Sequence, residues 1–183
     1  MNEEMRKAIE NYAEGVRKVY EIGIPFSKNI AQTLEKLGGK LQIERISVWY
    51  DSELRLRNEL WESKFTIKVR PYDCTIKYYE REKYFQIAKQ IGHLFLHTTY
   101  VDTIENNEKA LLFTARVLDA RQGIQANEFA YNLLMPRKEF TEEVRKNTEN
   151  KMVNMKNVAE KFEVNYHIAE YRAKELKLIQ PTL

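Results

Sequence analysis

The stretch from Phe85 to His97, Phe-Gln-Ile-Ala-Lys-Gln-Ile-Gly-His-Leu-Phe-Leu-His, decides the fold. Its apolar residues recur at the three- and four-residue spacing of one helical face, which predicts a helix packed against a core. These residues are Tyr84, Ile87, Ala88, Ile91 and Phe95. A second stripe is polar, because residues three or four apart lie one turn above each other. It consists of Gln86, Gln90, His93 and His97. A polar stripe on a core helix indicates a cleft or buried polar partners.

The polar stripe has the spacing of a zinc-peptidase helix. In the pattern His-Glu-x-x-His, two histidines four residues apart bind the metal and the glutamate activates a bound water. The corresponding residues here are Lys89-Gln90-Ile91-Gly92-His93, so a lysine stands at one ligand position and a glutamine at the base position. The chemistry needs two imidazoles and a carboxylate, and these five residues supply one imidazole. We interpret the stretch as a metallopeptidase scaffold without its catalytic groups.

Composition indicates an ordinary globular protein. The 183 residues are 43% hydrophobic and 31% charged, which suits one domain or one domain with a small appendage. A net charge of +3 does not by itself indicate nucleic-acid binding. The single cysteine, Cys74, excludes an intrachain disulfide and a cysteine-rich metal site. No apolar run has the length of a membrane span, so we expect a soluble, cytoplasmic protein without a membrane partner.

The patterns along the chain predict an α+β fold. One amphipathic helix is expected at residues 3–21. A second should end at about Leu37, because two glycines follow it. Alternating residues predict a small antiparallel sheet, with strands at 40–50 and 65–70. The strand at 65–70 should form a hairpin with Cys74 to Tyr79, in which Cys74 is buried. Further helices are expected after the one at 85–97. They lie at 124–134 before Pro136, at 140–146, and as two short helices within 154–178.

Three segments together carry a resemblance to a known family. The segment Gln125-Ala-Asn-Glu-Phe-Ala-Tyr-Asn-Leu-Leu-Met-Pro136 resembles the Glu-Ala-Asn-x-Phe-Ala-x-x-Leu-Leu-Met-Pro signature of the ImmA/IrrE family of metallopeptidases. The helix at 85–97 resembles that family's Phe-x-x-Ala-His-Glu-Leu-Gly-His-Leu-Leu-Leu-His. Residues Ala159 to Val164 resemble its Ala-x-x-Phe-x-Val segment. The resemblance implies a zincin-like domain at 1–150. It also implies a helix-turn-helix-like subdomain at 151–183, packed on that domain.

The family's site residues fall on degenerate positions of this sequence. The resemblance places the first histidine ligand on Lys89, the catalytic glutamate on Gln90 and the second histidine ligand on His93. The third ligand, a glutamate before the Ala-Asn pair, falls on Gln125. If the two sequences are instead aligned two residues further upstream, this ligand position falls on Gly123, which also cannot bind a metal through its side chain. A lysine ammonium repels a divalent cation, a glutamine cannot take a proton from water, and a neutral amide is a poor zinc ligand. We therefore expect no catalytic residue and no metal or other cofactor, with zinc as the alternative.

His93 and His97 remain as weak metal candidates, because they are four residues apart on one helical face. We favour two hydrogen-bonded side chains that fill a former cleft, because such a pair lacks the further ligands that zinc requires. No spacing singles out a carboxylate that completes the pair. The carboxylates considered are Asp102, Glu105, Asp119 and Glu128. Lys89 would put its charge at the metal position and hydrogen-bond Gln90 or Gln125.

Intact members of the family are implied to cleave helix-turn-helix repressors of prophages, mobile elements or stress responses. For this chain we expect a catalytically inactive pseudo-metallopeptidase that binds such a repressor, or another regulatory protein, as an antirepressor or modulator without cleavage. One alternative is an active zinc metallo-endopeptidase with ligands that we do not recognise. A second is a direct DNA-binding regulator that uses residues 154–178. The basic residues in 154–178 are few and are mixed with Glu170 and Glu175. This is little positive charge for binding to the phosphates of DNA.

Overall fold

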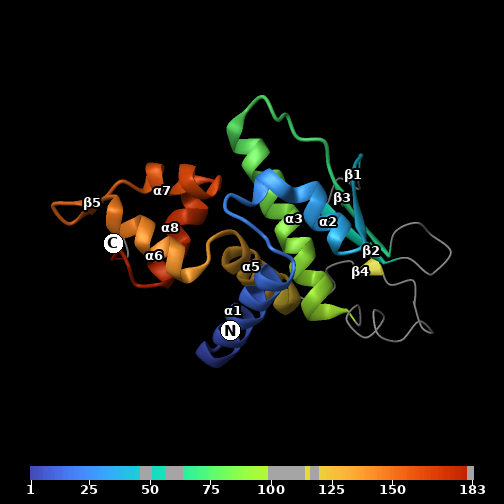
Figure 1. The fold of residues 1–183 in the computed structure, drawn as a ribbon, viewed down its shortest axis with the longest axis horizontal. Helices are drawn as coiled ribbons and strands as arrows, with labels where there is room; N and C mark the ends of the chain where they lie inside the picture. Colours follow the sequence, from blue (N-terminus) through green and yellow to red (C-terminus); the bar gives the residue numbers. More distant parts are fainter. Residues whose placement is uncertain (46–50, 57–63, 99–113, 116–119, 181–183) are drawn as a thin grey trace.

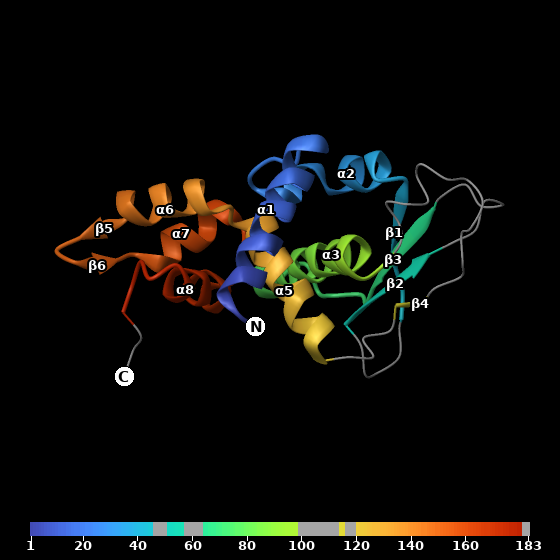
Figure 2. The same ribbon diagram turned by 90° about the horizontal axis from the view of Figure 1, so that it is seen from below.

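Two long helices, α3 (Lys77–His97) and α5 (Ala120–Leu134), lie side by side at the centre of the structure (Figures 1 and 2). The structure is a computed structural model that describes residues 1–45, 51–56, 64–98, 114–115 and 120–180. A small sheet lies at one end of the helix pair and the C-terminal helices lie at the other (Figure 2). The predicted helices at 85–97 and 124–134 are confirmed within α3 and α5. The α+β class is confirmed as well.

A glycine sets how closely α3 and α5 approach each other. A Cβ atom on Gly92 would lie 3.0 Å from the carbonyl oxygen of Ala126 and 3.1 Å from the Cβ of Phe129. Only a residue without a side chain fits such a contact, so the backbone of α5 packs directly on α3. Around this point Phe95 stacks on Phe129 with ring centroids 6.2 Å apart.

The N-terminal helices cover the pair and agree with the prediction. In α1 (Glu3–Val19), Asn2 caps the first turn by accepting a hydrogen bond from the backbone N–H of Met5 at 2.9 Å. The buried face of α1 packs on α5 and consists of Ile9, Ala13 and Val16. A 3₁₀ turn, η1 (Phe26–Asn29), leads into α2 (Ile30–Lys36), after which Gly38 adopts a φ of 75° and ends the helix.

The main sheet is mixed, which corrects the prediction of an antiparallel sheet. Its strand order is β1-β3-β2-β4, formed by β1 (Gly39–Ile43), β3 (Phe65–Val69), β2 (Ser52–Leu56) and β4 (Thr114–Ala115). β2 pairs antiparallel with β3 and β4, whereas β1 pairs parallel with β3. In the sheet, β3 lies between β1 and β2. The alternation of apolar and polar residues within one strand does not show which strands are neighbours, so the sequence patterns could not predict this order. All five residues of β3 are buried.

The predicted hairpin from 65–70 to 74–79 is wrong. After β3, Asp73 forms a local turn with Thr75. Oδ1 of Asp73 accepts one hydrogen bond from the backbone N–H of Thr75 at 3.1 Å and another from the Thr75 hydroxyl, Oγ1, at 2.5 Å. The helix α3 then begins at Lys77, so the apolar residues that resembled a strand are its first turn. Cys74 is exposed in this turn and is not buried.

The C-terminal part contains α6 (Arg137–Lys146), α7 (Met155–Phe162) and α8 (Tyr166–Glu175). A short hairpin of β5 (Thr148–Glu149) and β6 (Met152–Val153), which the sequence patterns did not predict, precedes α7. Glu163 has a φ of 52° and turns the chain from α7 into α8. The helices α7 and α8 share a small buried core that consists of Val158, Ala159, Phe162, Val164, Ile168 and Ala169, and Leu176 beside it is partly buried. α8 lies on α5, where Arg172 donates to the Oδ1 of Asn132 at 2.6 Å.

Within the described ranges, none of the helices combines the length and the apolar character needed to cross a membrane.

Replacement of Gly92 by alanine should destabilise the protein, because the backbone of Ala126 cannot yield without moving α5. We expect the free energy of unfolding to fall by about 1–3 kcal/mol, the usual range for overpacking. The matched control is Gly15→Ala in α1, where nothing lies within 4 Å of the new Cβ. That change should stabilise by about 0.5–1 kcal/mol through helix propensity. Urea unfolding of both variants measures the difference, and equal effects would contradict the close approach at Gly92.

Candidate functional site

The polar stripe of α3 is buried beside the sheet rather than facing solvent. The exposed fractions of Gln86, Gln90 and His93 are 8%, 2% and 1%. His97, one turn further on, is half-buried. Buried polar groups need hydrogen-bond partners, because an unmatched group loses its hydration without compensation. The partners come from β2 and α5.

Ser52 of β2 connects the two glutamines. Its Oγ donates to the Oε1 of Gln86 at 2.9 Å and accepts from the Nε2 of Gln90 at 2.8 Å. Gln86 in turn donates to the Oε1 of Glu82 at 2.9 Å. The hydroxyl has one hydrogen, which goes to Gln86, so residue 90 must be the donor in its contact with Ser52. A carboxylate has no hydrogen to donate, and the network therefore fits glutamine and not glutamate at position 90.

The histidines form a second chain that ends on α5. His97 Nε2 lies 2.9 Å from Gln125 Oε1, and His97 Nδ1 lies 3.1 Å from His93 Nδ1. The amide oxygen of Gln125 can only accept, so His97 donates its hydrogen from Nε2; in the tautomer with this single hydrogen, Nδ1 of His97 accepts from Nδ1 of His93. In that arrangement His93 Nε2 is an unprotonated nitrogen, and it is buried with no hydrogen-bond partner among the residues that the structure describes.

The surroundings of His93 disfavour the protonated form of its imidazole. Burial, then His97 and then Lys89, lower the pKa of His93 to about 4, so it is neutral at pH 7. Burial also lowers the pKa of Lys89, whereas Asp51 and Glu82 raise it. Lys89 is half-buried, and within the described part of the chain no hydrogen bond joins it to Gln90 or Gln125.

This geometry lies inside a segment that a family comparison identifies. The model of the IrrE N-terminal-like domain, Peptidase_M78, matches residues 78–174, which is just over half of the chain. The chain belongs to the ImmA/IrrE family. The match begins in the first turn of α3 and ends in α8, so it includes α3, α5 and the C-terminal helices. It confirms the family that the sequence motifs indicate. No curated protein matches the sequence significantly.

The residues present do not fit the zinc ion that the ImmA/IrrE family implies. Of the four positions that the family pattern assigns to the site, only His93 offers a zinc-ligand side chain. Gln90 is bonded to Ser52, and the oxygen of Gln125 is occupied by His97. In the ranges that the structure describes, no three His, Cys, Asp or Glu side chains converge as a metal site would need. A half-buried ammonium at Lys89 adds a repulsive charge.

The further carboxylates weighed for the histidine pair do not complete it. Glu128 lies in a separate buried cluster with Arg172 of α8, and it does not form a three-ligand group with His93 and His97. Asp102, Glu105 and Asp119 lie outside the described residues.

Sequence reasoning missed two residues of this region. Ser52, which joins Gln86 and Gln90, stands in a charged segment whose pattern gives no signal of a buried hydroxyl. Arg172 is 1% exposed. It had a usable signal, because it shares one face of α8 with Ile168, Ala169 and Ala173. An arginine on an apolar helical face indicates a buried ion pair rather than a contact to DNA.

We expect the His93 imidazole to titrate near pH 4, as measured by NMR of the three histidines. Since this pKa lies below the ordinary 6.5, the stability contributed by neutral His93 is present above pH 6.5. It is lost as the pH falls through about 4. His93→Gln assigns the resonance and should reduce the loss of stability in acid. A midpoint near 6.5 for His93 would contradict the buried, neutral imidazole.

Proposed function

We propose that this member of the ImmA/IrrE family is a catalytically inactive pseudo-metallopeptidase that binds a regulatory protein without cleaving it. The observation that carries the proposal is the hydrogen-bond direction at Ser52, which requires a donor at position 90. The position of the catalytic base is thus a hydrogen-bond donor to Ser52, a role that an ionised carboxylate cannot fill.

The partner that the family suggests is a helix-turn-helix repressor of a phage or mobile element. Binding without cleavage would make the protein an antirepressor or a modulator that acts in the cytoplasm. This part of the proposal rests on what intact family members are implied to cleave, and no residue of the structure names the partner.

The site retains groups that suit recognition. Gln90 Oε1 and His93 Nε2 are buried acceptors on successive turns of α3, and neither receives a hydrogen bond from the part of the chain that the structure describes. An unmatched buried acceptor lowers stability by about 1–3 kcal/mol, and a bound backbone or side-chain N–H that pairs with it recovers this loss. Both atoms are buried, so a partner would pair with them only after a rearrangement that uncovers this part of α3. Such a partner would bring neutral hydrogen-bond donors, because the adjacent Lys89 disfavours a cation.

Direct DNA binding through the C-terminal helices receives less support. Arg172 is buried against α5, and Lys174 forms an ion pair with Glu170 at 3.2 Å. The remaining basic surface of α8 is small for a helix that contacts phosphates.

Metal analysis of the purified protein tests the loss of the site. We expect less than about a tenth of an equivalent of zinc, unchanged when zinc is added, because a single imidazole ligand does not hold the ion. The matched variant is the triple reversion Lys89→His, Gln90→Glu and Gln125→Glu, which restores the family pattern. It should bind about one equivalent if the scaffold of α3 and α5 is intact. About one equivalent in the unmodified protein would contradict the proposal.

A binding experiment tests the non-cleaving role. The protein is incubated with a purified helix-turn-helix repressor of a phage or mobile element, the mixture is separated by size-exclusion chromatography, and the masses of the proteins in each fraction are measured by mass spectrometry. We expect a complex that contains the repressor at full length, with or without added zinc. Repressor fragments whose formation a chelator prevents would show an active peptidase and overturn the proposal.

A further inference from the structure

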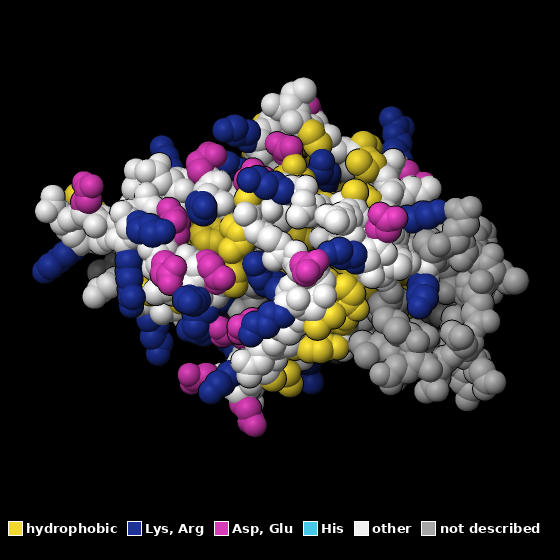
Figure 3. All heavy atoms as spheres, viewed as in Figure 1, with side chains coloured by type: hydrophobic (Ala, Val, Ile, Leu, Met, Phe, Trp, Pro, Cys, Tyr) yellow, Lys and Arg dark blue, Asp and Glu magenta, His cyan; other side chains and the backbone are white. Residues whose placement is uncertain are grey.

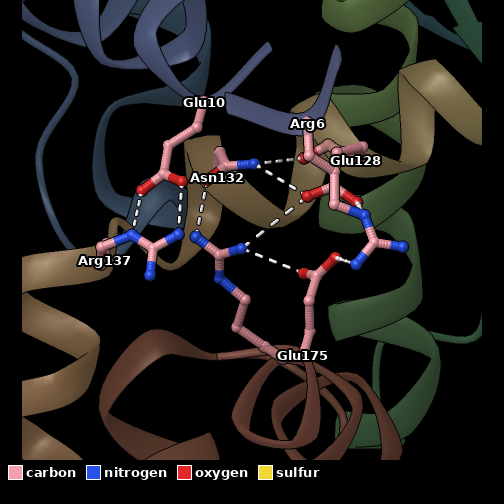
Figure 4. A network of polar contacts seen from close by, with 7 residues as sticks. Arg6, Glu10, Glu128, Asn132, Arg137 and Glu175 are labelled. Carbon is pink, nitrogen blue, oxygen red and sulfur yellow. Dashed lines mark hydrogen bonds and ion pairs between the residues drawn. The ribbon is translucent and has the colours of Figure 1, made fainter. Parts of the chain in front are cut away.

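A cluster of buried charges lies between α1, α5 and α8, apart from the polar stripe of α3 (Figure 4). Glu128 of α5 and Glu175 of α8 meet there, and both side chains are almost fully buried, with exposed fractions of 4% and 6%. Two carboxyl groups in one buried cluster repel each other when both are ionised, unless cations compensate both charges. The nearby arginines approach Glu175 to 2.8 and 3.1 Å but Glu128 only to 3.9 and 3.8 Å, so Glu128 is the less compensated carboxyl and the one that favours a proton.

Two arginines hold the carboxyl pair from opposite sides. Arg172 lies 3.1 Å from Glu175 and 3.8 Å from Glu128, and Arg6 lies 2.8 Å from Glu175 and 3.9 Å from Glu128. Asn132 completes the contact by donating to the backbone oxygen of Glu128 at 2.9 Å and accepting from Arg172 at 2.6 Å. The cluster therefore connects α8 to α5 and to α1 through groups that are mostly buried.

Other titratable and charged groups surround the pair. Glu10 of α1 is bonded to Arg137 of α6 through both carboxylate oxygens, at 2.5 and 2.6 Å, and also acts on Arg172. Tyr131 of α5 and Tyr171 of α8 pack against each other with ring centroids 4.8 Å apart, and burial raises the pKa of both phenols. Glu10 and Arg137 neutralise each other, so neither relieves the repulsion between Glu128 and Glu175.

Burial and the neighbouring Glu175 raise the pKa of Glu128 from 4.5 to about 7, while Arg172 and Arg6 oppose the rise. Glu128 is thus the member of the pair that holds the proton near neutral pH.

We propose that Glu128 and Glu175 form a pH-responsive clasp that holds the α7–α8 helix pair on α5 while Glu128 is protonated and loosens it when the proton is lost. The inference stands apart from the proposed function, because it concerns α5 and α8 and not the polar stripe of α3. Release of α8 would uncover the side of α5 that carries Tyr131 and Asn132.

The direction of the effect follows from linkage. The docked state binds the Glu128 proton more tightly than the released state, in which the pKa of the Glu128 carboxyl has its ordinary value of 4.5. Docking is therefore strongest below about pH 4.5 and weakens as the pH rises toward about 7, the pKa of Glu128 in the docked state. One proton changes the docking equilibrium by at most about tenfold per pH unit within that window.

Hydrogen–deuterium exchange of the full chain tests the clasp. Protection factors of the α8 amides, corrected for the intrinsic rate at each pH, are compared at about pH 5.5 and about pH 7.5, with α3 as the internal reference. We expect the protection of α8 relative to α3 to be on the order of tenfold lower at the higher pH. Equal pH dependence in α3 and α8 would overturn the proposal.

Two carboxyl variants identify the group. Glu128→Gln keeps the shape of the protonated acid and is neutral at every pH, so the protection of α8 should be high and nearly independent of pH. Glu10→Gln is the matched control, a nearby carboxyl bonded to Arg137 instead, and it should keep the pH dependence of the unmodified chain. If Glu10→Gln abolishes the dependence, or Glu128→Gln retains it, the titrating group is not the Glu128–Glu175 pair.

Discussion

The close approach of α3 and α5 at Gly92 is the contact on which the rest of the structure depends. It lets the backbone of α5 lie against α3, so that Gln125 reaches His97 across the helix interface at 2.9 Å. Beyond Gln125, α5 turns Asn132 toward α8, where Arg172 binds it. The polar stripe and the buried charge cluster are thus both positioned by one helix. A longer distance between α3 and α5 would break the hydrogen bond between His97 and Gln125, both of which are half-buried.

The polar stripe shows how a catalytic scaffold can persist with different chemistry. The polar residues of the stripe take part in two chains of hydrogen bonds. Gln90 donates to Ser52 and Ser52 donates to Gln86, whereas His97 connects His93 to Gln125. Buried hydrogen bonds of this kind fix side-chain positions because leaving them unmade costs more than forming them gains. In the proposed pseudo-peptidase, these hydrogen bonds would order the polar face of α3 in the place of metal coordination.

The sequence predicted the helices well because their signals are local. Periodicity identified the helices at 85–97 and 124–134, and the glycines after Leu37 marked the end of α2. The sheet was predicted less well, since the parallel pairing of β1 with β3 depends on strand order and not on any single segment. At the site, the loss of ligand types was readable from Lys89, Gln90 and Gln125. The role of Ser52 was not, because a hydroxyl has no pattern that shows which distant helix it faces.

The three replaced positions are consistent with one another as a set of charges. The family pattern implies a doubly charged metal balanced by two glutamates, one as base and one as ligand. Without the metal, two carboxylates would remain close together in a buried site, and the repulsion between them would be strong at low effective dielectric. Glutamine at positions 90 and 125 removes both negative charges while keeping nearly the same shape. Lys89 then contributes one positive charge, which Asp51 and Glu82 counter. Any one of these replacements made alone would leave a charge unbalanced, so under the proposed function the three form one consistent set, in which hydrogen bonds take the place of the metal.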